Sequence, residues 1–501
     1  MRKGALFAAF VLLAPGLLNA ADPPTQDERE MKRFIEAFQI LQENAATPFD
    51  IDQAFYQGVI PGMLRHLDPH SIFFDPDQYA QMKQMQASTS KGFGSIVSVL
   101  PGRVLVMQTA PNSPSARAGL IPGDEIVAVN NYRLDRLELD QIVELLSESK
   151  QKAARLVVHH PGSMQLTDLT LVPEAMLESS VERAFLLKPG IAYIRVGSFE
   201  EKTGQQIRSA IEKLGGRELK GLVIDLRNNP GGLMTAALET ASFFLKSDQV
   251  ILSVKGRNVP ETVERVPKDN APYAFPLAVL VNAKTASASE IVSGTLQDHD
   301  RAVIVGEPSF GKGLVQSVYP LAEGTGLALT TALYYIPSGR SIQKSFDAQR
   351  SAADEGFALG ATAAHPNERK DFKTDSGRPV PGGGGIVPDI AAFPTDMNPF
   401  RGALEGSGAF TTFAVQYTRD HKIEPGWQVS AEALDEFRAW LAERRILPGV
   451  AEWSANRDYV EVRLKTEIYN LSFGVDKGDE VEAQTDPPIQ KAVEAIEKSK
   501  P

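Results

Sequence analysis

Residues 276–316 read PLAVLVNAKTASASEIVSGTLQDHDRAVIVGEPSFGKGLVQ, and this stretch decides the fold. Its apolar run at 277–281 has the length and composition of a buried strand, and a helix pattern follows it after a turn of small residues. A second apolar run, 302–305, leads into a glycine loop that holds Lys312. The stretch therefore predicts a strand, a serine-bearing turn and a helix, and then a strand whose loop can bring a lysine to face the turn.

The same alternation of buried strands and helices extends over the central part of the chain. It is carried by apolar runs at 191–196 and 221–226 and by helix patterns at 204–214 and 234–245. Such alternation predicts α/β layers around a largely parallel sheet. A functional site is expected in the loops that follow such strands. Two motifs fall there, NNPGG at 228–232 and KTASASE at 284–290.

The composition is that of a soluble globular protein with several domains. The 501 residues are 43% apolar and 23% charged, and the formal net charge is −11. An acidic chain disfavours nucleic acid or an anionic membrane surface as its main partner. The chain has no cysteine, which excludes disulfides, thiol nucleophiles and thiolate metal sites.

The first 20 residues have the pattern of a signal peptide. Arg2 and Lys3 precede an apolar run that is too short to span a membrane, and the small residues near Ala20 fit a cleavage site. No later apolar run is long enough to cross a bilayer. We therefore expect an exported protein of the periplasm or cell envelope without a membrane span.

The rest of the chain divides into four parts. Residues 21–90 have helix periodicity, residues 91–175 change to short strands and turns, residues 176–398 hold the α/β pattern, and residues 399–501 return to helices. Within the third part, the polar segment 344–381 lacks apolar periodicity, which predicts a surface insertion or a flexible flap. The helical tail indicates no chemistry of its own.

A serine in the 284–290 turn needs a base within hydrogen-bond reach to act as a nucleophile. His299 is the nearest in sequence of the seven histidines, but its polar surroundings predict a solvated loop residue. Lys312 is the better base, provided that burial lowers its pKa. The glycines on either side of Lys312 allow a closely packed loop, and Gln316 is placed to hold the amine by a hydrogen bond.

Two alternative motifs are less complete. Residues 306–312, GEPSFGK, match the start of a phosphate-binding loop, but Gly313 stands where that motif needs Ser or Thr. His66 and His70 have the spacing of a metal pair on a helix, but Pro69 between them breaks a helix. We therefore expect neither a metal nor a cofactor.

A set of motifs in a fixed order gives the chain a resemblance to the C-terminal processing peptidases, also called tail-specific proteases, which are PDZ-containing serine–lysine peptidases. The motifs are LDPHS at 67–71, DLRNNPGG at 225–232, TASASE at 285–290, GEPSFGKGLVQ at 306–316, PSGRSIQ at 337–343 and GIVPD at 385–389. The resemblance implies an α/β (crotonase-like or ClpP-like) protease core with an inserted PDZ domain, a helical N-terminal region and a helical C-terminal extension.

The same resemblance implies the catalytic residues. It makes Ser287 the nucleophile, Lys312 the general base and Gln316 the residue that orients the base. The oxyanion hole is expected from main-chain N–H groups, those of Ala288 and of either Gly231 or Gly232. The sequence leaves the choice between the two glycines open.

Residues 91–175 resemble a PDZ domain through the loop Gly92-Phe93-Gly94, the segment 114–124 and the helix over 139–146. A PDZ domain adds a peptide strand to a sheet edge and captures its terminal carboxylate on main-chain N–H groups. The resemblance therefore implies protein substrates with exposed C-termini, and it extends to a gating role for this domain. An activator or adaptor protein and self-association are left open.

The favoured function is an exported serine endopeptidase that hydrolyses peptide bonds near the C-termini of envelope proteins. One alternative is a catalytically silent PDZ scaffold, which has no reason to keep the full set of Ser287, Lys312 and Gln316. A second alternative is a crotonase-like hydratase. Its coenzyme A substrate is not expected outside the cytoplasm, and the PDZ domain would have no task in it.

Overall fold

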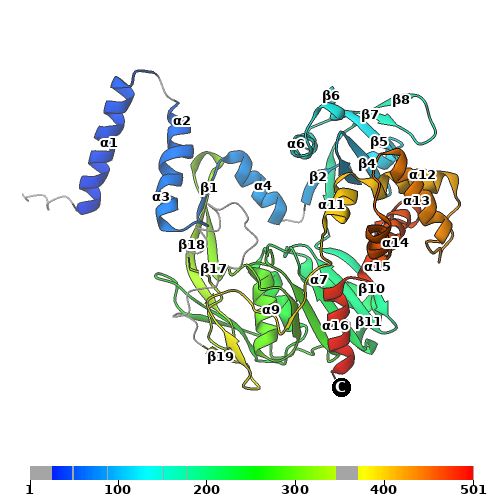
Figure 1. The fold of residues 1–501 in the computed structure, drawn as a ribbon. Coiled ribbons are helices and arrows are strands. Elements are labelled where there is room, and N and C mark those ends of the chain that lie inside the picture. Colours follow the sequence, from blue (N-terminus) through cyan, green and yellow to red (C-terminus); the bar gives the residue numbers. More distant parts are fainter. Residues whose placement is uncertain are drawn as a thin grey trace, which may run out of the picture. The chain divides into compact units, whose positions relative to one another are not determined.

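A computed structural model describes residues 25–47, 50–86, 89–150, 152–177, 179–345 and 371–499 (Figure 1). The predicted signal peptide, residues 1–20, lies outside these ranges. The chain forms two compact units, residues 1–66 and residues 67–501. Over the described ranges, no helix combines the length and the apolar character needed to cross a membrane.

The described part of the first unit is helical, which confirms the helical N-terminal region that the sequence predicts. Its elements are α1 (Gln26–Asn44), α2 (Ile51–Gln53), the π-helical segment η1 (Ala54–Val59) and α3 (Ile60–Leu67). Thr25 caps α1, because its hydroxyl accepts the N–H of Glu28 and its own N–H donates to the Glu28 carboxylate. The rings of Phe34 and Phe38 pack edge-on against Phe55.

Outside the PDZ domain, the second unit contains two large sheets, and the first confirms the predicted α/β core. Its six strands lie in the order β10-β11-β12-β15-β16-β21. They are β10 (Val181–Lys188), β11 (Ile191–Val196), β12 (Gly221–Asp225), β15 (Leu277–Val281), β16 (Val303–Gly306) and β21 (Ile390–Ala391). All neighbouring strands are parallel except β10 and β11. The loops at the carboxyl ends of β12, β15 and β16 therefore meet at one edge.

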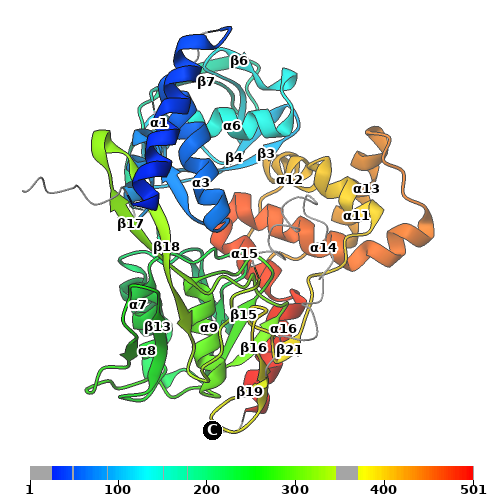
Figure 2. The same cartoon turned by 90° about the vertical axis from the view of Figure 1, so that its left-hand side faces the viewer.

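Helices cover both faces of this sheet. On one face lie α7 (Thr203–Leu214), α8 (Met234–Ser242) and α9 (Ala288–Asp298), and on the other lies α16 (Pro487–Lys498). Figure 2 shows β15 and β16 between α9 and α16. The side chains of successive strand residues point to opposite faces of the sheet. Ile224 packs in the apolar cluster that includes α9, and Val223 packs in the cluster that includes α16.

The second sheet is antiparallel and extends the α/β core. Its strands are β1 (Ile72–Phe74), β18 (Gly326–Tyr335), β13 (Val250–Lys255), β14 (Thr262–Arg265) and β17 (Leu314–Pro320), which pairs with β18. The sequence assigned all of residues 21–90 to one helical region. The structure instead divides that region after His66, because β1 pairs with β18.

The predicted PDZ domain is a β-sheet module with one long helix. Its strands are β3 (Ser95–Leu100), β4 (Arg103–Thr109), β5 (Glu125–Val129), β6 (Tyr132–Arg133), β7 (Ala154–His159) and β8 (Leu166–Leu171), and its helices are α5 (Pro114–Arg117) and α6 (Leu139–Ser149). Ile142 of α6 packs with Val104 and Leu156 in its own apolar core. Before and after the module, β2 (Thr89–Gly92) pairs with β9 (Glu174–Leu177).

The C-terminal extension is helical, as predicted. It contains α11 (Pro399–Gly406), α12 (Ala409–Asp420), α13 (Ala431–Glu443), α14 (Val450–Phe473) and α15 (Val475–Ala483) before α16. A core that includes Phe410, Phe437 and Trp440 holds α11 to α14 together. By contrast, α16 packs on the parallel sheet. The end of the extension is therefore part of the α/β core.

The structure describes part of the predicted polar insertion, residues 344–381, and a hairpin in this part contacts the core. Residues 346–370 lie outside the described ranges, and residues 371–381 form a hairpin of β19 (Asp371–Lys373) and β20 (Pro379–Pro381). Arg378 of this hairpin forms ion pairs with Asp300 and Asp389. Ion pairs therefore link this hairpin to the core, and the choice between a surface insertion and a flexible flap stays a prediction for residues 344–381.

Candidate active site

Ser287 lies in the turn between β15 and α9, directly before the first helical residue. Its backbone has φ 56° and ψ −117°, a conformation that costs roughly 1–3 kcal/mol for a residue with a side chain. A strained serine at a sharp strand-to-helix turn is also how α/β-hydrolases expose their nucleophile. Ser287 is half-buried, whereas Ser289 is fully buried and its hydroxyl donates to the carbonyl of Asn229. The turn therefore presents Ser287.

Lys312 lies in the loop between β16 and β17, and Gln316 lies on β17. The hydrogen bond expected between them is present: Lys312 Nζ donates to Gln316 Oε1 at 2.9 Å. The side-chain amide of Gln316 donates in turn to the carbonyl of His70, at 2.7 Å. The LDPHS segment thus contributes a main-chain carbonyl, and the histidine ring plays no part in this contact.

Burial lowers the pKa of Lys312, which favours the neutral amine that a general base needs. The carboxylates of Asp68 and Glu290 act in the opposite direction, because negative charge stabilises the protonated amine. Asp68 is itself held ionised. Its burial alone would raise its pKa, but hydrogen bonds from Ser71 and from the N–H of His70 hold it below its usual value.

The buried carboxylate of Glu290 connects the serine turn with the lysine loop. Its Oε2 accepts the main-chain N–H groups of Ser287, at 2.8 Å, and Lys312, at 2.9 Å. Its Oε1 accepts the N–H of Gly311 at 2.7 Å and the hydroxyl of Ser309. Burial raises the pKa of Glu290, and these four donors oppose that effect. One side chain therefore fixes both segments relative to each other.

Tyr334 on β18 makes a second connection between the same two segments. Its hydroxyl is directed at the carbonyl oxygens of Lys312, at 2.6 Å, and Ser287, at 3.1 Å. The side chain is 1% exposed, so these carbonyls are its partners in place of water. Tyr334 and Glu290 hold opposite polar groups of the Ser287 and Lys312 backbones.

The NNPGG loop lies against the serine turn. A Cβ atom on Gly231 would lie 2.8 Å from the N of Ala288 and 2.8 Å from the Cβ of Ser287. The N–H of Gly231 donates to the side chain of Asn229 at 2.8 Å, whereas the hydrogen bonds of the described residues leave the N–H groups of Gly232 and Ala288 without an acceptor. These two N–H groups are therefore the free donors beside Ser287.

Hydrogen bonds fix the NNPGG loop to the serine turn. The side chains of Asn228 and Asn282 face each other, with the Asn282 amide donating to Asn228 Oδ1 at 2.9 Å and Asn282 Oδ1 accepting the N–H of Asn228 at 2.9 Å. The N–H of Ala286 donates to the carbonyl of Asn229, at 3.0 Å. Thr285 is fully buried, and its hydroxyl donates to the carbonyl of Leu226.

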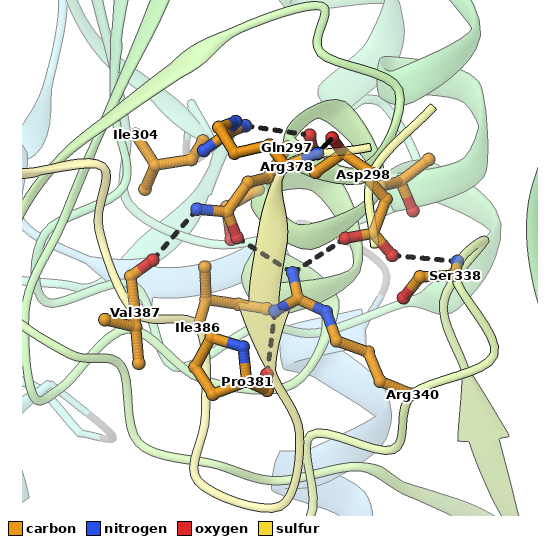
Figure 3. A network of polar contacts seen from close by, with 12 residues as sticks. Gln297, Asp298, Ile304, Ser338, Arg340, Arg378, Pro381, Ile386 and Val387 are labelled. Atoms are coloured by element: carbon orange, nitrogen blue, oxygen red, sulfur yellow. Dashed lines mark hydrogen bonds and ion pairs between the residues drawn. The ribbon is translucent and has the colours of Figure 1, made fainter. Parts of the chain in front are cut away.

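The far end of α9 is fixed by a buried polar network (Figure 3). Arg340 is 0% exposed, and its guanidinium lies 2.8 Å from Asp298 and donates to the side chain of Gln297 and the carbonyl of Pro381. The second oxygen of Asp298 accepts the N–H of Ser338 at 2.9 Å. The PSGRSIQ motif thus holds the helix that begins at the serine turn.

The structure corrects the prediction for His299. Its side chain is 7% exposed, lies 2.7 Å from both Asp375 and the carbonyl of Val250, and so is not a solvated loop residue. Asp375 belongs to the hairpin at 371–381, which the sequence pattern did not place there. The partial phosphate-binding motif at 306–312 is followed by β17, where a phosphate-binding loop would open a helix.

The PDZ loop has free N–H groups at the positions expected for a carboxylate site. Gly92 ends β2, and Phe93 and Gly94 connect it to β3. Their carbonyls accept the N–H groups of Ser115 and Ala110, whereas no described residue accepts the N–H groups of Phe93 and Gly94. The adjacent strand β3 lies at the edge of its sheet. In the described part of the chain it pairs with β4 alone.

Three residues of this site were missed as site residues. Glu290 had a signal, because a Ser-x-x-Glu spacing is typical of a capping box and predicts that the carboxylate returns to the N–H of Ser287. No sequence pattern predicted the contacts of Glu290 with the lysine loop. Tyr334 and Asp68 are distant from Lys312 in the sequence. The strand pairings that bring these segments together are not encoded by a short motif.

The sequence of this chain is similar to those of known proteins. The sequence model of peptidase family S41 matches residues 190–348, and that of the PDZ domain matches residues 105–159. The carboxy-terminal-processing protease of Bartonella bacilliformis is 33% identical over 353 residues, which are 68% of this chain and 80% of that protein. The chain belongs to peptidase family S41.

One further relative and one solved structure are also similar to this chain. Carboxyl-terminal-processing peptidase 2, chloroplastic, of Arabidopsis thaliana is 32% identical over 55% of this chain and 56% of that protein. The solved structure of the photosystem II D1 C-terminal processing protease is 25% identical, covers 75% of this chain and 96% of that one, and has a TM-score of 0.38. This S41 chain is a serine-type, C-terminal-processing protease with a PDZ domain, and its substrates are proteins.

Proposed function

We propose that this S41 protease hydrolyses peptide bonds with Ser287 as nucleophile and Lys312 as general base. The observation that carries the proposal is the half-buried amine of Lys312, which is held by Gln316 and whose loop shares one Glu290 oxygen with the serine turn. A serine nucleophile needs a base, and a lysine serves when burial lowers its pKa. The strained backbone of Ser287 adds support, since such strain is concentrated at functional sites.

The reaction proceeds through an acyl-enzyme. Neutral Lys312 takes the hydroxyl proton of Ser287 as the Oγ bonds to the peptide carbonyl carbon, and the carbonyl electrons move onto the oxygen. When the tetrahedral intermediate collapses, the C–N bond breaks and Lys312 gives its proton to the leaving amine. Water then attacks the ester, its proton passes to Lys312, and Ser287 regains a proton as the new carboxyl terminus leaves.

The negative oxygen of the intermediate is stabilised by main-chain N–H groups. We assign this role to Ala288, the first residue of α9, and to Gly232. The assignment is supported because no described residue accepts either of these N–H groups, whereas the N–H of Gly231 donates to Asn229. The N-terminal end of α9 favours negative charge at the same position. Gly231 contributes space, because a Cβ there would lie within 2.8 Å of the Ala288 nitrogen.

The PDZ domain recruits the C-terminus of the substrate in this proposal. The N–H groups of Phe93 and Gly94 bind the terminal carboxylate, and the polypeptide adds to the outer edge of β3. Ile96 of β3 and Leu139 and Val143 of α6 are 44–51% exposed, which provides apolar contacts for side chains near the terminus. An adaptor, a gating role and self-association stay predictions of the sequence.

We also propose that the protease acts on envelope proteins after export. The support is the signal-peptide pattern of residues 1–20. Cell fractionation followed by N-terminal mass spectrometry tests this proposal. Export predicts an N-terminus near Ala20 in the envelope fraction, whereas an intact N-terminus in the cytoplasm contradicts it.

Proteolysis is tested with an unfolded polypeptide that ends in apolar residues. The parent protein is expected to release fragments that mass spectrometry locates near the C-terminus, and Ser287→Ala is expected to release none. Ser289→Ala is the matched control, since Ser289 is buried and lies two residues away. Equal cleavage by the parent and Ser287→Ala would overturn the assignment. A polypeptide with an amidated C-terminus tests the PDZ role and should be cleaved more slowly.

A further inference from the structure

The last helix of the chain, α16, is fitted closely to the sheet that carries the active site. Its Ile489, Val493 and Ile496 pack in one apolar cluster with Val223 of β12 and Leu280 of β15. A Cβ atom on Gly221 at the start of β12 would lie 2.3 Å from a methyl carbon of Ile496. Only a glycine permits this approach, so α16 packs at a specific position on the sheet.

The first turn of α16 holds an arginine that comes from the other end of β12. Asp486, the N-cap residue of α16, accepts the N–H of Ile489 at 2.9 Å. Both of its carboxylate oxygens also accept the NH1 group of Arg227, at 3.0 and 3.1 Å. The side chains of Arg227 and Asp486 are 14% and 20% exposed. Largely buried charge pairs of this kind are costly to break from one side.

Arg227 is held on its other side by Asp225, the last residue of β12. Its Nε and NH2 groups donate to the Asp225 carboxylate, at 2.6 to 3.0 Å, and its own N–H donates to Asp225 Oδ1 at 2.9 Å. Asp225 is fully buried and also accepts the hydroxyl of Tyr193, at 2.8 Å. The guanidinium of Arg227 is therefore clamped between the sheet and α16.

The backbone at that point is held by this clamp and by the two hydrogen bonds between Asn228 and Asn282. A cavity of about 210 Å³ lies beside it, and its lining includes Arg227, Asn228, Asn282 and Asp486. Asn228, the next residue after Arg227, has a left-handed backbone with φ 63°. The NNPGG loop therefore starts with a strained residue beside an open space, between the clamped Arg227 and the pair of glycines.

We propose that Asp486 is a positioning residue for catalysis, which fixes the NNPGG loop through Arg227 and so places the oxyanion donor Gly232. The inference rests on the proposed function, because it assigns the C-terminal helix to the same site. The helical extension is then part of the catalytic machinery, although α16 contributes no group to the reaction itself. A displacement of about 1 Å at such a donor can cost up to 100-fold in rate.

Asp486→Asn is the informative variant, because asparagine is as good an N-cap as aspartate and keeps the side-chain size. It removes the charge that holds Arg227 and leaves the helix capped. We expect kcat to fall about tenfold with KM within twofold, since loss of an oxyanion donor itself costs about 100-fold or more. Hydrogen exchange at residues 228–232 should become faster. The apparent pKa in the pH profile of kcat/KM should stay unchanged, because Lys312 is not touched.

Glu497→Gln provides the matched control on the same helix. Glu497 pairs with Lys188 at 2.8 Å, an ion pair that also joins α16 to the sheet. This variant should keep the parental kcat and the parental exchange at residues 228–232. Arg227→Lys is the second test, since lysine cannot bridge two carboxylates as the guanidinium does. The double variant Asp486→Asn/Arg227→Lys should lose no more activity than Arg227→Lys alone.

The outcomes separate this inference from the proposed function. If Ser287→Ala keeps its activity, the proposed function fails. If Ser287→Ala is inactive but Asp486→Asn keeps the parental kcat, or if Glu497→Gln loses as much, the positioning role is overturned. If Asp486→Asn does not fold, Arg227→Lys carries the test, and an unchanged kcat in that variant overturns the role equally.

Discussion

The main-chain N–H groups of Ser287 and Lys312 donate to the same carboxylate oxygen, the Oε2 of Glu290, at 2.8 and 2.9 Å. The two residues are far apart in the chain, one before α9 and the other after β16. Because one buried carboxylate oxygen accepts both N–H groups, it fixes the distance between the two backbone segments. The relative position of Ser287 and Lys312, the proposed dyad, is therefore set by hydrogen bonds of their main chains as well as by their side chains.

Glu290→Gln should disrupt this assembly. An amide offers one acceptor oxygen and turns its NH2 group toward N–H donors, so at least two of the four donors lose their partner. We expect the free energy of unfolding to fall by roughly 3 kcal/mol and peptide hydrolysis to be lost. Chemical denaturation and the cleavage assay measure both. Ser309→Ala removes one donor and should have a smaller effect, and a Glu290→Gln variant with parental stability and activity would contradict the account.

Ser287→Gly should be more stable than Ser287→Ala, although both lack the nucleophile. Ser287 adopts a positive φ of 56°, which glycine accepts without strain. We expect a difference of about 1 kcal/mol in the free energy of unfolding, measured by denaturant titration of the two inactive variants. Equal stability would mean that the turn stores no strain.

The fold could be predicted from the sequence to a large extent, because its elements are locally encoded. The apolar run at 277–281 forms β15 over the same residues, and the helix pattern at 204–214 forms α7. The helical ends and the PDZ module also follow from periodicity and turn residues. The boundary between the two units after His66 and the packing of α16 on the sheet could not be predicted, since both depend on contacts between distant segments.

The site shows the same limit. The spacing of Gln316 from Lys312 predicted their hydrogen bond, which is present. His299 was misplaced, because its partners Asp375 and Val250 come from a hairpin and a strand remote in sequence. Short motifs name the residues that carry chemistry, whereas their distances are set by long-range contacts such as those of Glu290.

Asp68→Asn should shift the pH dependence of hydrolysis to lower pH. Activity requires neutral Lys312, so kcat/KM rises with pH as the amine loses its proton. The negative charge of Asp68 raises the pKa of Lys312, and its removal lowers that pKa further, so the rising limb starts at lower pH. Measurement of kcat/KM from pH 5 to pH 10 compares the variant with the parent. A shift to higher pH would contradict the role of Lys312 as base.

Tyr334→Phe should loosen the serine turn without a change in volume. The hydroxyl is directed at the carbonyls of Lys312 and Ser287, and these buried acceptors would lose their donor. We expect a loss of about 1 kcal/mol in the free energy of unfolding and a several-fold lower kcat. Tyr335→Phe, at the next position of β18, is the control. Equal effects of the two substitutions would argue against a specific role for Tyr334.

The most direct test of the dyad is to trap the acyl-enzyme. The protein is mixed with an activated peptide ester, quenched in acid and measured by intact-protein mass spectrometry, and the adduct is located by peptide mapping. The account predicts one acyl group on Ser287 in the parent, none in Ser287→Ala, and none on the same timescale in Lys312→Met. An adduct on another residue, or acylation of Lys312→Met at the parental rate, would contradict the assignment of Ser287 and Lys312.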